Sequence, residues 1–272
     1  MHMPAQGQDV LDALSRLDSA ITSSEEEFSP QDAYYIGRAV AAHILGYYAL
    51  YTKKPELTHY LNKICRTLTV NSSAPDGFNG YHVMILDDNT PNAFSTPGGH
   101  IYLSYGLVDL VTSEDMLAAV IAHEIAHIQL HHGIAEIQQD RLVQDLNREQ
   151  ARIARQTEQE IRAEQQRLFT QPVNEMVNIL FIRGYSQLQE LEADSFALTL
   201  LASSGYNPES LIEMLKTLEK SRQGRDGGLY NSHPLPARRL TEAASKAAAY
   251  RVKNTQSARK SRFTSSIRGD SR

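Results

Sequence analysis

The chain has almost no cysteine: Cys65 is the single one among 272 residues. One cysteine excludes an intrachain disulfide and a cysteine-rich zinc knuckle. Long apolar runs are also missing, since no stretch approaches the roughly 20 residues of a transmembrane helix, and no signal peptide is expected. Basic residues are not in surplus, because 27 lysines and arginines stand against 32 aspartates and glutamates. This balance does not favour binding to nucleic acid.

What the chain does contain is an HExxH motif, at residues 123–127, inside a stretch with helical character. Positions four apart lie one above the other on a helix, so the imidazoles of His123 and His127 point the same way. Together they can hold one Zn²⁺ ion, and Glu124 can reach a water molecule on that metal. The motif therefore predicts metal-assisted peptide hydrolysis, in which Glu124 moves the proton.

The surroundings of the motif indicate a buried helix. An almost continuous apolar run contains it, and Thr112 with Asp115 resembles a capping box. Two histidines and a glutamate in such a core are costly unless a metal compensates them. The alternative is a pair of core histidines beside a paired glutamate. His131 and His132 fall off the ligand face, and we expect both to face solvent near the helix end.

A second apolar stretch, residues 187–203, carries a candidate for the third metal ligand. Glu190 and Asp194 are four residues apart and share one helix face, whereas Glu192 points elsewhere. Glu190 is the expected third ligand, and Asp194 can accept a hydrogen bond from the outer ring nitrogen of a ligating histidine. The alternative is a solvated acidic helix face. One zinc ion per chain, held by three protein ligands, would keep an open position for water.

Four landmarks together make the chain resemble a known family. They are, in chain order, PNAFSTPGGH at 91–100, HExxH at 123–127, ELEAD at 190–194, and Ser232-His233-Pro234 with Arg239 downstream. In order and spacing, residues 80–245 resemble the HtpX, CAAX prenyl endopeptidase and BepA-type zinc metallopeptidases, the gluzincins with the signature HExxH…ExxxD. One departure is visible, because Ser186-Gln187 stands where that family usually has Ser-Arg.

The resemblance implies an α+β fold, a mainly helical, zincin-like metallopeptidase domain with a small β-sheet whose edge strand borders the active-site cleft. The residues agree, because segments 81–86 and 100–104 have the composition of strands. A strand at a sheet edge can pair with an extended peptide, and the resemblance gives this role to residues 98–103. The expected substrate-binding residues are Asn92, Gly99, His100, Ile101 and Tyr102. Asn92 is equally well explained as a turn residue.

The catalytic set is completed by a donor that stabilises the oxyanion on the attacked carbonyl. His233 or Arg239 could supply it opposite the base, Glu124. His233 could equally approach the metal in a resting state and block the open position. The alternative is a structural turn followed by a surface arginine. Tyr185 is a further candidate donor, although an ordinary buried tyrosine explains it better.

Composition divides the chain into three parts. Residues 1–30 form a polar, helical extension, residues 31–250 hold the metallopeptidase domain with a long charged helix at about 134–168, and residues 251–272 form a basic tail. The long helix is expected to be a lid, a homo-oligomer contact or a plain solvated helix. The tail is expected to be disordered, with peripheral contact to an anionic membrane or a partner as the alternative to an idle tail.

These features predict a zinc-dependent metalloendopeptidase that acts on polypeptides bound in extended form. The resemblance implies unfolded or misfolded substrates of the cell envelope or membrane. It also implies an extracytoplasmic location, in the bacterial periplasm or at a membrane, with the export signal absent from this sequence. The alternative is a latent or inactive, zinc-binding, chaperone-like protein that binds extended polypeptide without cleaving it.

Overall fold

The computed structural model describes residues 28–77, 79–140, 174–221, 233, 237–250 and 256–268. Within them the protein is mainly helical and has one three-stranded sheet, so the α+β prediction is confirmed. The helix expected within residues 1–30, and the charged helix from residue 141 onward, lie outside the described residues. No described helix has both the length and the apolar character needed to cross a membrane.

The sheet contains β1 (His82–Leu86), β2 (Ala93–Thr96) and β3 (His100–Ser104), in the spatial order β1-β3-β2. β3 pairs in parallel with β1 and antiparallel with β2. The turn between β2 and β3 contains Gly98 and Gly99, whose φ angles are 83° and 105°. Glycine reaches this region without the steric cost that other residues meet. The sequence did not predict β2, because its four residues lie between two turn segments.

The central place of β3 corrects the predicted peptide-binding strand. The expectation that residues 100–104 form an edge strand is wrong, because β1 and β2 occupy both sides of β3. Pairing of a substrate with Ile101 or Tyr102 is therefore excluded in this sheet, and both side chains are fully buried. The edge strand that reaches the HExxH helix is β2. There the hydroxyl of Ser95 donates a hydrogen bond to the carbonyl oxygen of Glu124, over 3.2 Å.

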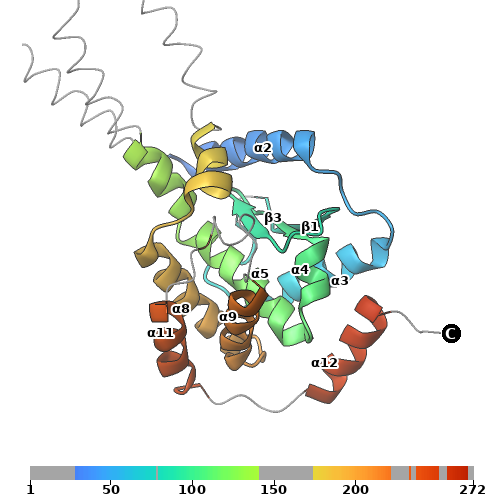
Figure 1. Ribbon diagram of the computed structural model, residues 1–272. Coiled ribbons are helices and arrows are strands. Elements are labelled where there is room, and N and C mark those ends of the chain that lie inside the picture. The colour runs from blue at the N-terminus through green and yellow to red at the C-terminus, as the bar shows by residue number, and fades with distance from the viewer. Residues whose placement is uncertain are drawn as a thin grey trace, which may run out of the picture.

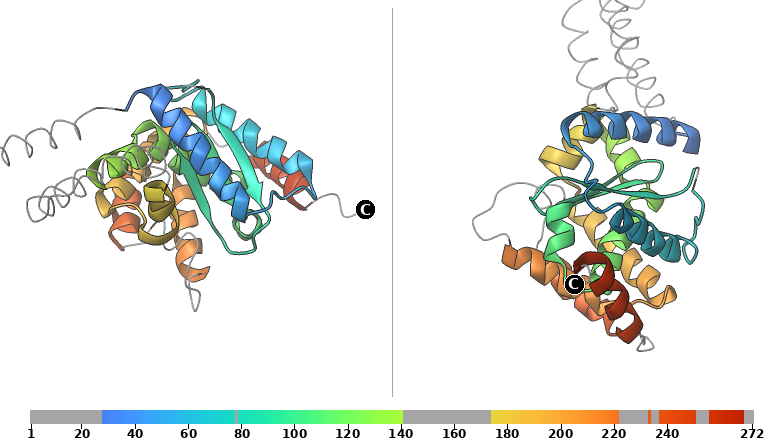
Figure 2. Two further views of the ribbon diagram at one scale, coloured as in Figure 1. Left: turned by 90° about the horizontal axis from the view of Figure 1, so that it is seen from above. Right: turned by 90° about the vertical axis from the view of Figure 1, so that its right-hand side faces the viewer.

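The two faces of the sheet are covered by different helices (Figure 1). α2 lies across one face, and the helices around α5 lie below the other, as the right-hand view of Figure 2 shows. The helices that lie wholly within the described residues are α2 (Pro30–Tyr47), α3 (Pro55–Thr69), α4 (Tyr105–Leu110), α5 (Glu114–Gln129), α8 (Gln187–Ser203), α9 (Glu209–Ser221), α11 (Ala237–Ala247) and α12 (Gln256–Phe263), with π-helical turns at Ile179–Arg183 and Thr264–Arg268. Residues 132–140 and 174–178 are helical too.

Side chains along β3 alternate between two hydrophobic cores, as expected for a strand covered on both faces. Ile101 and Leu103 pack into the larger core, with α3, α5, α8 and α9. Tyr102, between them, packs into the smaller core beneath α2. α5 lies at the centre of the larger core, and every residue from Glu114 to His127 is buried. The HExxH motif is therefore enclosed, as the sequence predicted.

α5 begins one residue later than the predicted cap, because Ser113 rather than Thr112 caps it. The hydroxyl of Ser113 accepts a hydrogen bond from the backbone N–H of Met116 (3.2 Å). Beyond the last turn, His131 has a φ of 55°, in the left-handed region. This residue interrupts the helical backbone just after α5, so the position of His132 does not follow from the periodicity of α5.

The C-terminal segment is helical and docked, so the expectation of a disordered tail is wrong for residues 256–268. Two arginines of α12 meet the carboxylates buried at the start of α5: Arg259 donates to Asp115 (2.9 Å), and Arg262 donates to Glu114 (2.6 and 3.0 Å). Phe263 joins the larger core. Composition suggested disorder because the partners of these basic residues are far away along the chain.

Replacing Arg259 by alanine is expected to destabilise the protein by about 2 kcal/mol, because the buried Asp115 would lose a hydrogen bond from a charged donor. The melting temperature should fall by about 5 °C. Thermal unfolding followed by circular dichroism measures this fall. The control is Lys260→Ala, which removes an exposed cation from the same helix. Equal melting temperatures for the two variants would contradict a docked α12.

Candidate metal centre

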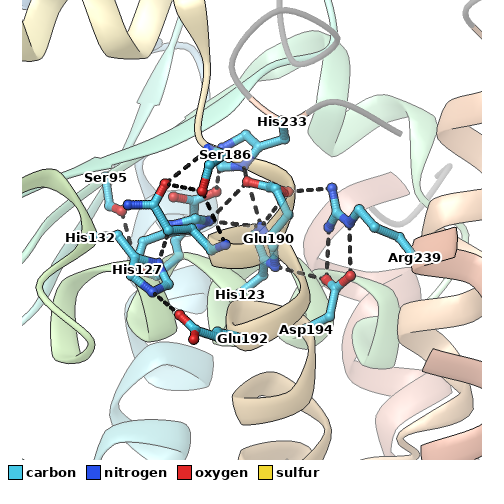
Figure 3. A network of polar contacts seen from close by, with 12 residues as sticks. Ser95, His123, His127, His132, Ser186, Glu190, Glu192, Asp194, His233 and Arg239 are labelled. Atoms are coloured by element: carbon cyan, nitrogen blue, oxygen red, sulfur yellow. Dashed lines mark hydrogen bonds and ion pairs between the residues drawn. The ribbon is translucent and has the colours of Figure 1, made fainter. Parts of the chain in front are cut away.

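Two helices bring the predicted ligands together. α5 carries His123, Glu124 and His127, and α8, packed along it, carries Glu190 and Asp194 (Figure 3). All five side chains are buried, and Glu190 has no exposed surface. Periodicity predicts that His123 and His127 share one face of α5, and that Glu190 and Asp194 share one face of α8.

α8 begins with a capping box. The hydroxyl of Ser186 accepts a hydrogen bond from the backbone N–H of Gln189, and the side chain of Gln189 accepts one from the N–H of Ser186 (2.9 Å). Because this exchange satisfies two backbone donors, it stabilises the turn just before Glu190.

Four side chains converge on one point: His123, His127, Glu190 and His233. Nε2 of His123 lies 3.1 Å from Nε2 of His127 and 3.3 Å from Nδ1 of His233. Oε1 of Glu190 lies 3.3 Å from Nε2 of His127 and 2.8 Å from Nδ1 of His233. Ligand atoms at tetrahedral corners about 2.0–2.1 Å from a zinc ion lie about 3.3 Å apart. The four side chains therefore form a candidate metal site with suitable spacing.

The polar atoms of this cluster also fit a cation. The buried Oε2 of Glu124, beside the cluster, has no hydrogen-bond partner among the described residues, so it can accept a hydrogen bond from a water molecule. Ring nitrogens that face one another cannot all donate, and a cation that accepts their lone pairs resolves the conflict. Burial holds the pKa of His127 well below its ordinary value, so its imidazole is neutral, as a ligand must be. Nitrogen and carboxylate donors of this kind suit zinc.

A buried arginine anchors the carboxylates of α8. Arg239 donates two hydrogen bonds to Asp194, each of 2.7 Å, and pairs with Glu190 (Figure 3). Arg239 is only 2% exposed, so the alternative of a surface arginine is wrong. Burial alone would raise the pKa values of both carboxyls, but the charge of Arg239 holds each of them below its ordinary value. Both groups are therefore ionised.

Asp194 faces the outer nitrogen of the first histidine, where the sequence placed it. Its Oδ1 lies 3.1 Å from Nδ1 of His123. Burial would lower the pKa of His123, but Asp194 and Glu190 together raise it to about 9 in the metal-free protein. The contact leaves Nε2 of His123 to face the candidate metal position.

His132 is the residue of the site that the sequence did not reveal. It is 4% exposed, so the expectation that it faces solvent is wrong. Its Nδ1 lies 2.9 Å from Nδ1 of His127, and its Nε2 lies 3.3 Å from Oε2 of Glu192. Helical extrapolation failed because α5 ends at Gln129 and His131, in the left-handed region, interrupts the helical periodicity. No signal in the local sequence predicts that turn. His131 itself is exposed, as expected.

The other predicted residues lie around the cluster in different ways. Tyr185 stacks on the ring of His127, with centroids 4.0 Å apart, and is buried. Asn92 is buried beside β3, where its backbone N–H donates to the hydroxyl of Ser104 (2.8 Å). Gly99 lines a cavity of about 250 Å³ that also touches Ser95, His127 and Tyr185. His100 is half-buried at the start of β3.

The helix-borne HExxH, the glutamate of a second helix and the aspartate behind the first histidine define a metallopeptidase type of site. The chain belongs to Peptidase family M48, whose family model matches residues 55–247, so the resemblance is confirmed. Residues 256–268, with the docked arginines, lie beyond this match.

Three relatives illustrate the similarity. The beta-barrel assembly-enhancing protease of Yersinia pestis is 26% identical over 255 residues, covering 90% of this chain and 48% of the relative. Metalloprotease LoiP of Escherichia coli is 29% identical over 178 residues, covering 64% and 66%. The mitochondrial metalloendopeptidase OMA1 of Schizosaccharomyces pombe is 24% identical over 185 residues, covering 67% and 51%. The chain thus spans from about half to two thirds of the length of these curated relatives.

Proposed function

We propose that this protein is a zinc-dependent metalloendopeptidase that cleaves unfolded or misfolded polypeptides. The observation that supports it most is the convergence of His123, His127 and Glu190 beside the carboxylate of Glu124, in a member of Peptidase family M48. When bound, zinc would polarise the scissile carbonyl and acidify a water molecule. Glu124 would serve as the general base that accepts a proton from the attacking water and as the acid that delivers it to the leaving amine. Asp194 and Arg239 orient the ligands.

His233 lies where it can keep the site closed. Its Nδ1 belongs to the four-residue cluster, and its Nε2 lies 3.4 Å from Oε1 of Glu124. A fourth protein ligand takes the position that a catalytic site leaves open for water. We therefore propose a resting state in which His233 occupies that position and leaves it when a substrate binds. Arg239 is less suited to the role of oxyanion donor, because it is engaged by Glu190 and Asp194.

Replacing His233 by alanine tests this resting state. The variant should still bind about one zinc per chain, because three ligands remain, and should cleave unfolded casein several-fold faster than the wild type. Zinc content by atomic absorption and a casein digestion series measure both quantities. A variant that binds zinc but cleaves more slowly would contradict the resting state and favour His233 as the oxyanion donor.

The names of the relatives bear on the substrate class and the compartment. Relatives named for beta-barrel assembly favour substrates of a bacterial envelope, hence an extracytoplasmic location. Peripheral membrane contact and a homo-oligomer stay predictions. A chaperone-like protein without cleavage is not favoured, because the matched relatives are named as proteases.

Zinc content together with casein cleavage tests the proposed function. Carefully prepared protein that binds no zinc would contradict it.

A further inference from the structure

Three side chains in consecutive contact connect the candidate metal site with the surface. His127, a ligand, contacts His132 through their Nδ1 atoms (2.9 Å), and His132 contacts Glu192 (3.3 Å) (Figure 3). His132 is buried, whereas the side chain of Glu192 is 53% exposed. Neither residue belongs to the ligand cluster. Burial of the His132 imidazole is costly unless its nitrogens form hydrogen bonds, so its two contacts need a structural explanation.

The metal site determines which atom donates and which accepts in each of these two hydrogen bonds. If Nε2 of His127 offers its lone pair to a metal, the proton of the neutral ring must sit on Nδ1. That N–H can only donate to Nδ1 of His132, which must then be the unprotonated nitrogen. The proton of His132 consequently sits on Nε2 and is donated to the carboxylate of Glu192. One carboxylate thus sets the tautomers of two rings in succession.

The outer ring nitrogen of His123 also has an acceptor, but the acceptor is of a different kind. Its outer nitrogen faces the carboxylate of Asp194 directly (3.1 Å), whereas that of His127 faces an imidazole. Each of the two α5 ligands therefore has an acceptor behind it. The acceptor for His127 comes from the segment just after the helix, and the backbone turn at His131 brings it there.

We propose that His132, backed by Glu192, is a positioning residue that holds His127 in the tautomer and orientation required of a metal ligand. This inference rests on the proposed zinc site. Partners of this kind fix the direction of the ligand ring and increase its basicity, and their loss typically weakens metal binding by about 10–100-fold. His132 acts only through His127 and does not touch a substrate.

The test measures zinc affinity by competition with a chelator, independently of peptide cleavage. His132→Leu fills the space but offers no acceptor, and should weaken zinc binding by about 10–100-fold. His132→Asn should recover most of this loss, because Oδ1 of asparagine stands where Nδ1 of histidine stands and accepts the same hydrogen bond. Glu192→Gln should cause a smaller loss, since the amide oxygen still accepts from His132.

The matched control is His131→Asn, which changes the exposed neighbour and keeps a residue that tolerates the left-handed backbone. It should bind zinc like the wild type. Circular dichroism of each metal-free variant checks that it is folded. If His132→Leu does not fold, His132→Gln takes its place, because its amide group stands at the Nε2 position and offers no acceptor to Nδ1 of His127.

Two results would overturn the inference. One is wild-type zinc affinity in folded His132→Leu. The other is an asparagine variant no better than the leucine variant, which would mean that packing rather than the hydrogen bond matters. In both cases wild-type protein still binds zinc, so the proposed function stands. Failure of the wild type to bind zinc would instead remove the proposed function and this inference together.

Discussion

Replacing Glu124 by glutamine is expected to reduce peptide cleavage by orders of magnitude while the protein keeps its fold and its metal. The carboxylate lies beside the candidate metal position without being one of its four converging groups, so the ligands stay in place. Glutamine has nearly the same shape but cannot take up a proton. Because general acid–base catalysis typically contributes about 10²–10⁴-fold, the cleavage rate should fall by about that factor. Casein digestion and zinc content, measured on the same samples, check both parts.

The control for this experiment is Glu209→Gln, which makes the same chemical change at an exposed residue of α9. It should cleave at the wild-type rate. Cleavage by the Glu124 variant at more than a tenth of the wild-type rate would contradict the role of Glu124 as base. Cleavage by neither variant nor wild type, with zinc present, would point to the latent or chaperone-like alternative.

Replacing Arg239 by methionine is expected to destabilise the metal-free protein by about 3–5 kcal/mol, the typical effect of removing one partner from a buried ion pair. Methionine has a similar length, so the change removes the charge more than the packing. Glu190 and Asp194 would remain buried without the cation that holds their pKa values low. Urea unfolding of the metal-free protein measures the loss. Zinc should offset part of it, because the ion supplies positive charge beside Glu190.

The neighbouring Arg238 offers a matched control, since its side chain is 62% exposed and pairs with Glu242. Arg238→Met should change the unfolding free energy by less than about 1 kcal/mol, as surface ion pairs contribute little. In the wild type the pKa values of Glu190 and Asp194 are lower than in the unfolded chain. The two carboxylates therefore stabilise the folded wild type at pH values above the carboxyl pKa of the unfolded chain. This stabilisation is lost as the pH falls through the folded-state pKa values. The difference between wild type and Arg239→Met should therefore shrink in acid, and a constant difference would contradict the explanation.

The three predicted ligands come together because their positions depend mainly on helical periodicity. His123 and His127 share a face of α5, Glu190 and Asp194 share a face of α8, and apolar residues around them make the two helices pack. Local spacing in an apolar helix is visible in a single sequence. The three ligands on α5 and α8 could be predicted for this reason. His233 was named from the family landmarks and not from periodicity, and the fold brings it to the same point.

Features that depend on pairing between distant segments were not predictable. The strand order β1-β3-β2 makes residues 100–104 central, although their composition is equally typical of an edge strand. Arg259 looked like part of a solvated tail because its partner, Asp115, lies 144 residues away. In the absence of such a partner, a basic and serine-rich segment is indistinguishable from disorder.

The sequence by itself determined the helical character of α5 and α8, the buried setting of HExxH and the class of chemistry. Only the tertiary structure decided which strand lies at the edge, that Arg239 is buried between two carboxylates, and that His132 stands behind His127. Periodicity specifies the face of a helix on which a side chain lies. It does not specify what meets that face, because this depends on turns and contacts between residues far apart in the chain.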